Sequence, residues 1–308
     1  MKVLLAVDQL RDAKVAARFL ETVRLPRCTA LSILHVIEIP HTAIRYAAQQ
    51  LMLADWRKDA ATSARRLIDR ITPPLRAQGL RVCPLVKEGL PGPGLINMVE
   101  RMRADLTILG SHGYSRLIRF LLGSVTEMLL NEAPCSILIV RGRPRGRQGR
   151  GMRVLLAMDF SKDAKGAARF LSTLRLPRAS RVTLLHVEEH ADSVLARISG
   201  MGRIDLSRAV QLAMRERKRR TLLMLERMGQ RFRQLGLTVD EVFAQGAPAE
   251  EILRAAERHR ADLIVMGSNE SAGWMPTHLH RPRPTSAISS APARKSPRRQ
   301  DALPAAPL

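Results

Sequence analysis

The chain repeats itself, and this repeat constrains the fold more than any other feature of the sequence. The segment Val3–Asp8 recurs as Val154–Asp159, and the match continues through a shared Leu-Pro-Arg and a shared Leu-His-Val segment. After a change of length in the middle, Ala104–Ser111 matches Ala261–Ser268. The 308 residues are enough for two domains of roughly 150 residues, each with its own core. We therefore expect two copies of one domain.

Strand-like and helix-like segments alternate along the first copy. Five apolar strand-like runs cover about residues 2–7, 31–36, 80–86, 105–109 and 135–140. Helical segments lie between them, and the long amphipathic segment within 42–71 is expected to stop before Pro73-Pro74. Because parallel strands joined by helices need right-handed crossovers, the pattern predicts an α/β fold with a doubly wound parallel, Rossmann-like sheet in each copy.

The second copy departs from the first after Ser268. Glu270 stands where the first copy has Gly113, and no apolar final strand follows. The remaining segment is rich in Pro, Ser, Ala and Arg, a composition that buries too little apolar surface to order itself. We divide the chain into a first domain (1–141), an Arg/Gly-rich linker (142–152), a second domain without its last helix and strand (153–268), and a disordered tail (269–308).

Small residues at fixed spacing follow the fourth strand of the first copy. Two residues separate Gly110 from Gly113, and nine separate Gly113 from the pair Gly123-Ser124. Glycines let backbone N–H groups approach a phosphate, and a helix start near Gly123 presents unpaired N–H groups. Ligands of such sheets bind beyond the carboxyl ends of the strands, so Asp8 and Gly110 should meet there. The pattern predicts a nucleotide phosphate site, although a turn and a helix start without a ligand would use the same residues.

The residues quoted above resemble a known family. The repeated Val-Leu-Leu-Ala strand with its aspartate, the Leu-His-Val strand end, and Gly110–Gly113 with Gly123–Thr126 closely resemble the universal stress protein family of the UspA type. The resemblance covers the first copy and the second up to about Ser268, so the chain is similar to a tandem member. It implies the adenine nucleotide alpha hydrolase-like form of the doubly wound fold and an ATP site, with Mg²⁺ as a companion ion.

The resemblance also implies the roles of residues in that site. Asp8 contacts the ribose or adenine, and the backbone of Val36 meets the adenine edge. The phosphates are held by Gly110, Ser111, His112, Gly113, Gly123, Ser124, Val125 and Thr126. Two alternatives stay open: Asp8 as the cap of the following helix, and His112 as an exposed loop histidine.

The second copy keeps only part of this set. It retains Asp159, Val187, Gly267 and Ser268 but has no phosphate cradle. We therefore expect one nucleotide per chain. His35 and His186 lie at matching strand ends and are expected to satisfy local hydrogen bonds.

Catalytic motifs are missing from the sequence. There is no Gly-x-x-x-x-Gly-Lys-Ser/Thr loop, and no carboxylate lies between Gly110 and Thr126. Phosphoryl transfer usually needs a cationic clamp and carboxylate-held metal, so efficient turnover is not expected. We expect a nucleotide-dependent regulator of the stress response; a slow ATPase and a non-enzymatic assembly module are the alternatives.

Charge favours polyanionic partners. The chain has 51 Lys+Arg against 28 Asp+Glu, a formal net charge of +23. Basic clusters lie in the linker, at Arg215–Arg220 and in the tail, which would recruit an acidic or nucleic-acid partner in the assembly-module interpretation. Aromatic residues make up only 3% of the chain, and the sequence has no stacking platform or recognition-helix motif, which weighs against nucleic acid.

The remaining predictions concern compartment and assembly. The three cysteines, Cys28, Cys83 and Cys135, show no metal-ligand spacing and are expected to be reduced thiols. No apolar run approaches the roughly 20 residues of a membrane span, so we expect no membrane contact and a cytoplasmic protein. Members of the family pair through their fifth strands, so the resemblance implies a homodimer through Cys135–Val140.

Overall fold

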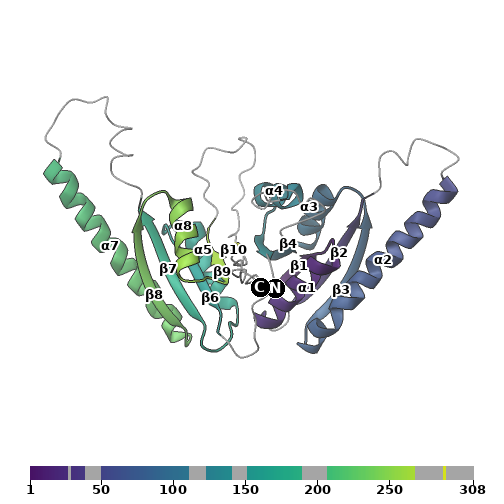
Figure 1. The fold of residues 1–308 in the computed structure, drawn as a ribbon, viewed down its shortest axis with the longest axis horizontal. Coiled ribbons are helices and arrows are strands. Elements are labelled where there is room, and N and C mark those ends of the chain that lie inside the picture. Colours follow the sequence, from purple (N-terminus) through teal and green to yellow (C-terminus); the bar gives the residue numbers. More distant parts are fainter. Residues whose placement is uncertain are drawn as a thin grey trace, which may run out of the picture.

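The first copy forms a five-stranded parallel sheet (Figure 1). The computed structural model describes residues 1–26, 29–38, 50–110, 123–140, 151–188, 207–267 and 287–288. The strands of the first sheet are β1 (Lys2–Ala6), β2 (Ala30–Ile37), β3 (Arg81–Glu88), β4 (Leu106–Gly110) and β5 (Ser136–Val140). They lie in the order β3-β2-β1-β4-β5, and all neighbours are parallel. The predicted doubly wound fold is confirmed, and the strand order reverses between β1 and β4.

Helices cover both faces of this sheet. They are α1 (Leu10–Thr22), α2 (Gln50–Ala77), α3 (Pro91–Met102) and α4 (Ser124–Glu132). Alternate β1 residues point to opposite faces: Val3 and Leu5 join the core under α1 and α2, whereas Leu4 joins the core under α3 and α4. Both faces are therefore apolar, as buried parallel strands require.

One predicted boundary is wrong. The long helix α2 does not end before Pro73-Pro74 but continues through both prolines to Ala77. Ile71 and Leu75 are 1% and 0% exposed, so the last turn is held by packing on the sheet. This packing outweighs the hydrogen bonds that the prolines cannot donate.

The second copy repeats the fold in shorter form. Its parallel strands are β6 (Arg153–Ala157), β7 (Arg181–Glu188), β8 (Thr238–Gln245) and β9 (Leu263–Val265). Its helices are α5 (Lys162–Thr173), α7 (Ser207–Gln234) and α8 (Pro248–Arg258). The described residues contain no counterpart of α4 or of a parallel fifth strand; β10 (Ala287–Ile288) pairs antiparallel with β9 in that position. The other tail residues lie outside the described ranges.

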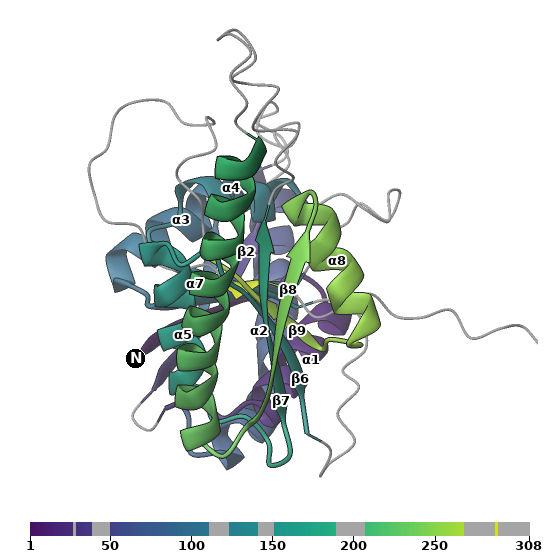
Figure 2. The same ribbon diagram turned by 90° about the vertical axis from the view of Figure 1, so that its left-hand side faces the viewer.

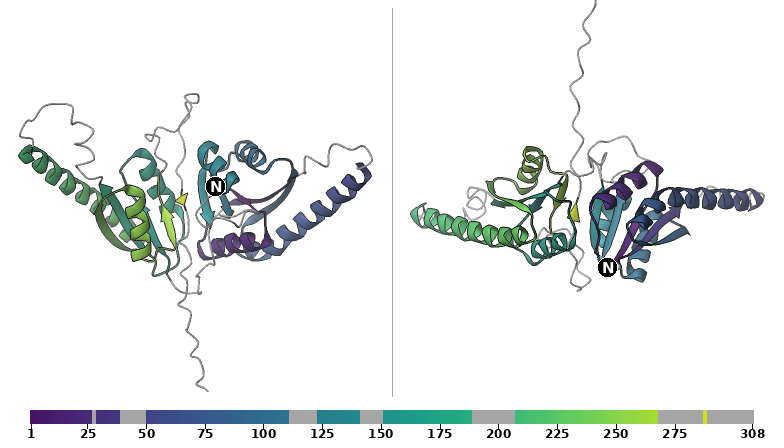
Figure 3. Two further views of the ribbon diagram at one scale, coloured as in Figure 1. Left: turned by 45° about the horizontal axis from the view of Figure 1, so that its top comes forward. Right: turned by 90° about the horizontal axis from the view of Figure 1, so that it is seen from below.

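The two copies pack against each other (Figures 1 and 3). Arg24 and Arg175 form an antiparallel bridge with reciprocal backbone hydrogen bonds of 3.1 and 2.9 Å. Apolar side chains of both domains, among them Phe19 and Phe170, line one small pocket. Strand β5, through which two chains are expected to pair, contacts β10 of its own chain.

Among the described helices, none combines the length and the hydrophobicity that crossing a bilayer requires.

Candidate functional site

The strand register brings the predicted site residues to one end of the first sheet. Ala6 pairs with Leu34, and Leu5 pairs with Ile108. Two steps further along each strand, Asp8, Val36 and Gly110 therefore lie within one residue of the same level, at the carboxyl ends of β1, β2 and β4. Since the strand order reverses between β1 and β4, this is where a ligand is expected.

His35 fixes the end of β1. Its Nδ1 lies 2.9 Å from the carbonyl oxygen of Val7, and the Val7 N–H donates to the carbonyl of Leu34 at 2.9 Å. The second copy has the same contact, 2.6 Å between Nδ1 of His186 and the carbonyl oxygen of Met158. The prediction that both histidines satisfy local hydrogen bonds is confirmed.

Asp8 does not cap the following helix. The N-cap of α1 is Gln9, and no side chain makes a capping hydrogen bond there. Within the described ranges the Asp8 carboxylate has no hydrogen bond or ion pair. Partial burial of this carboxylate raises its pKa; the charge of His35 lowers it, and Asp12 and Glu38 raise it further.

Asp159, the counterpart of Asp8 in the second copy, is engaged locally. Its Oδ1 accepts a hydrogen bond from the Ser161 N–H at 2.9 Å. Ser161 is the N-cap of α5, and its Oγ accepts from the Ala164 N–H at 3.0 Å. The matching aspartates therefore differ: one stabilises a helix start, and the other has no structural partner among the described residues.

Gly110 is required by packing. A Cβ at this position would lie 2.8 Å from the Cβ of Asp12 in the first turn of α1. The same holds for Gly267, where a Cβ would lie 2.5 Å from the Ala164 nitrogen. These glycines let the first helix of each domain lie close to the neighbouring strand end, so their presence does not by itself indicate a ligand.

Gly123 has no such structural reason among the described residues. It is the N-cap of α4, with φ −65° and ψ 152°, angles open to any residue. A Cβ there would meet nothing within 4 Å among the described atoms, and no side chain caps the helix. The first N–H groups of α4 are therefore left without a side-chain acceptor, which is the arrangement that binds anions.

The first turn of α4 contains the next predicted residues. Ser124 is exposed, Val125 is half-buried and Thr126 is buried. The Thr126 side chain is thus withdrawn from the surface, whereas the Ser124 hydroxyl is accessible. Ser111, His112 and Gly113 lie outside the described residues.

Side chains fill the corresponding end of the second sheet. The His186 ring lies between Phe160 and Phe243, with centroid distances of 5.5 and 5.8 Å. Lys218 of α7 lies 5.0 Å from the centroid of Phe243. Sequence reasoning missed this cluster. Phe160 stands where the first copy has Gln9, but nothing in the sequence shows that the ring of Phe243, from a distant strand, completes the stack.

Comparison with known proteins identifies the family. The model of the universal stress protein family matches residues 1–141 and 152–278. The chain belongs to the universal stress protein family. Because both copies match, it is a tandem member, and the predicted family and repeat are confirmed.

Individual relatives are distant. Universal stress protein MJ0577 of Methanocaldococcus jannaschii is 24% identical over 152 residues, which cover 46% of this chain and 94% of that protein. Universal stress protein MJ0531 of the same organism is 35% identical over 63 residues, only 37% of its length. The crystal structure of a universal stress protein from Archaeoglobus fulgidus superimposes with a TM-score of 0.56 at 18% identity, covering 94% of this chain and 98% of that one. This last match extends the shared fold over both domains.

Proposed function

We propose that this universal stress protein is a stress-response regulator whose first domain binds one ATP. The observation that carries the proposal is Gly123, a glycine at a helix start that neither backbone angles nor described neighbours require. A glycine there leaves room for a phosphate to reach the N–H groups of α4. Membership of the family supports a nucleotide as the ligand class.

The adenosine part is assigned to the carboxyl ends of β1 and β2. Asp8 accepts hydrogen bonds from the ribose hydroxyls, and the backbone of Val36 contacts the adenine edge. The Asp8 side chain is exposed at the surface, but its carboxylate has lost part of its solvation, which raises its pKa, and no described group replaces that solvation. Ribose hydroxyl donors would replace it, so the ligand would relieve an unfavourable feature of the empty site.

The phosphates are assigned to the loop after β4 and the start of α4. Backbone N–H groups and the exposed Ser124 hydroxyl are the donors, and buried Thr126 contributes through its backbone alone. The full set proposed is Gly110, Ser111, His112, Gly113, Gly123, Ser124, Val125 and Thr126. Among the described residues, no group of three His, Cys, Asp or Glu side chains could hold a metal ion. Mg²⁺ would therefore enter on the phosphate oxygens of ATP.

The second domain is proposed to bind no nucleotide. Asp159 is engaged at the start of α5, and the stack of Phe160, His186 and Phe243 occupies the matching end of the sheet. A ligand there would have to displace these side chains. The expected stoichiometry is therefore one nucleotide per chain.

Nucleotide released from freshly denatured protein, identified by mass and counted per chain, tests the proposal. We expect one ATP or ADP per chain. Asp8→Asn should lose ATP binding in titration calorimetry, whereas the matched variant Asp159→Asn should bind like the wild type. Protein that releases no nucleotide and gives no heat on addition of ATP would leave a nucleotide-free scaffold as the better interpretation.

Hydrolysis is measured in the same preparations. The regulator proposal expects phosphate release near background, and the slow-ATPase alternative expects release that Gly123→Asp abolishes. Activity that survives this substitution comes from a contaminant.

Homodimer formation through β5 and a cytoplasmic location remain predictions. Because β5 contacts β10 of its own chain, pairing of two chains at this edge requires β10 to be displaced. Light scattering that shows only monomers at every concentration would contradict pairing.

A further inference from the structure

A row of arginines follows the outer surface of α7. One side of the helix has a row of positions four residues apart. Its members are Arg215, Arg219, Leu223, Arg227 and Arg231, with Leu223 in the middle. All five side chains are exposed. The helix lies at the outer edge of the second domain (Figures 1 and 2). We call Arg215, Arg219, Arg227 and Arg231 the arginine row.

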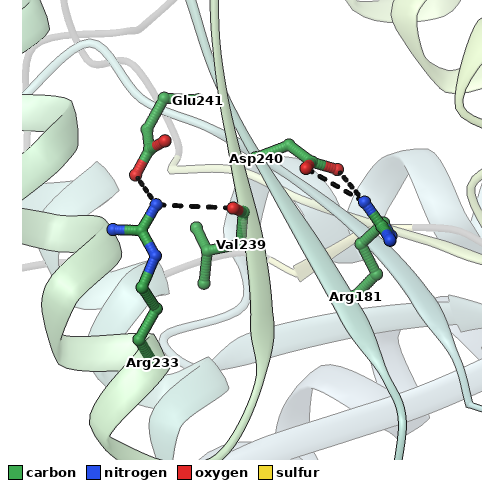
Figure 4. Close-up of polar contacts among 5 residues, drawn as sticks. All are labelled: Arg181, Arg233, Val239, Asp240 and Glu241. Atoms are coloured by element: carbon green, nitrogen blue, oxygen red, sulfur yellow. Dashed lines mark hydrogen bonds and ion pairs between the residues drawn. The ribbon is translucent and has the colours of Figure 1, made fainter.

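The arginine row has no structural use among the described residues. Several other arginines of the second domain are paired: Arg233 with Glu241 at 2.6 Å, Arg181 with Asp240 at 2.8 Å, and Arg217 with Glu188 at 3.1 Å (Figure 4 shows the first two). Among the residues that the structure describes, no side chain of the arginine row forms an ion pair or a hydrogen bond. Like charges at i, i+4 destabilise a helix, so the row is unfavourable in the isolated protein.

Only one member has a local explanation. Arg231 lies in the last turn of α7, where a cation interacts favourably with the helix dipole. Arg215, Arg219 and Arg227 lie too far from that end to gain from it.

The equivalent helix of the first domain differs in charge. Helix α7 contains nine Lys and Arg residues against two Glu, whereas α2, of the same length and place in the fold, contains six against three Asp. The fold therefore does not require this excess of positive charge, which is a feature of the second domain.

The apolar side chains exposed on α7 do not form a membrane-binding face. Leu212 and Leu223 lie on one side of the helix but about three turns apart, with Arg215 and Arg219 between them, and Leu222 and Met224 lie on opposite flanks of Leu223. Helices that lie in a bilayer interface present a continuous apolar stripe on one side and charges on the other. Here the continuous apolar side of α7 packs on the sheet through Leu225 and Phe232, so a bilayer would meet mainly charge.

We propose that the arginine row binds the phosphate backbone of a nucleic acid without reading its sequence. The arginines form two pairs, Arg215 with Arg219 and Arg227 with Arg231, whose members are about 6 Å apart along the helix, and Leu223 separates the pairs. Phosphates of one duplex strand follow each other with an axial rise of about 3.4 Å, so the two arginines of each pair can contact phosphates about two nucleotides apart. Arginine suits this role because its planar guanidinium binds phosphate oxygens in a bidentate manner. The scarcity of aromatic side chains excludes a stacking platform but leaves backbone contacts intact.

The salt dependence of the binding constant is the quantity that the test measures. Each phosphate contact contributes about 0.9 to the slope of log K against log salt for duplex DNA. Four contacts therefore weaken binding about 150-fold between 50 and 200 mM salt. The experiment uses the full chain and a 30-base-pair duplex of arbitrary sequence, titrated over this range.

Two variants that each remove four positive charges distinguish binding by the arginine row from binding by the overall positive charge of the chain. In the first, Arg215, Arg219, Arg227 and Arg231 are replaced by Gln, which has a similar helix propensity. In the second, the control, the exposed cations Lys58, Arg65, Arg66 and Arg70 of α2 are replaced by Gln. We expect the first variant to lower the slope by about 3 to 4 units and the control to lower it by less than one.

Several results would overturn the proposal. One is a wild type that does not bind the duplex at 50 mM salt, and another is an equal change of slope in both variants. A third is binding to vesicles of phosphatidylglycerol that the arginine-row variant loses while it keeps its binding to DNA. Circular dichroism and melting of each variant show whether a change of slope reflects contact or unfolding.

Discussion

Replacing Gly123 with Asp should raise the stability of the empty protein and abolish ATP binding. The substitution meets no described atom within 4 Å, and the backbone angles of −65° and 152° suit a non-glycine N-cap. Asp is among the preferred N-caps because its carboxylate accepts hydrogen bonds from the N–H groups of the first turn, here those of Val125 or Thr126. The gain over glycine is a few tenths of a kcal/mol, and the helix dipole adds about 0.3–1 kcal/mol.

The same carboxylate competes with phosphate for the same donors. Hydrogen bonds to charged groups contribute about 1.5–3 kcal/mol each, so losing two of them costs about 3 kcal/mol or more, before repulsion between the new carboxylate and the phosphates is added. This corresponds to at least a 100-fold weaker Kd. The melting temperature without nucleotide should rise by about 1–4 °C. Stability and binding therefore change in opposite directions, which a general structural defect would not produce.

Scanning and titration calorimetry of the same preparation measure both effects. The matched control is Ala247→Asp, at the N-cap of α8, which also has no capping side chain. It should stabilise the second domain and leave ATP binding unchanged. An undiminished ATP affinity in the Gly123 variant would refute the phosphate assignment, and a lower melting temperature would show that the loop needs glycine for structural reasons.

The remaining predictions concern stability and reactivity. Since folding raises the pKa of Asp8 above its ordinary value of 3.8, its charge destabilises the folded state as pH rises through the raised pKa; Asp8→Asn should stabilise the empty protein at pH 7, and the difference in urea denaturation should vanish below pH 3.8. Gly110→Ala, whose Cβ would lie 2.8 Å from that of Asp12, should destabilise by about 1–3 kcal/mol in the same assay, and an unchanged midpoint would contradict the packing role. Cys135 is buried, and burial raises the pKa of its thiol, so a maleimide should label exposed Cys83 before Cys135, which should react only on unfolding. The two domains share one hydrophobic cluster, so calorimetry should show one unfolding transition that ATP shifts as a whole; a shift of only half the enthalpy would mean that the domains unfold separately.

The sequence predicts the fold well because its signals are local. Apolar strands and the repeat are enough to predict two doubly wound sheets. The end of α2 is mispredicted because two adjacent prolines are a local signal for the end of a helix, whereas the burial of Ile71 and Leu75 depends on the sheet beneath them. The antiparallel pairing of β10 with β9 gives no signal in the composition of the tail.

The candidate site is predicted only in part for the same reason. Spacing places Asp8 and Gly110 at one edge, as the register confirms. It does not separate Gly110, which packing on Asp12 requires, from Gly123, which nothing described requires. That distinction rests on contacts between elements about a hundred residues apart, and it makes Gly123 the more informative residue to change.

The two domains have diverged in opposite ways from one plan. In the first, the carboxyl end of the sheet keeps a carboxylate without a described partner and a helix start without a cap. In the second, the same end is closed by aromatic rings and a capped helix, while the outer helix carries the arginine row. Features that are unfavourable in the isolated protein therefore occur at different places in the two copies. If each is retained for a ligand, the first domain binds a small anion inside its sheet edge and the second binds a long one on its surface.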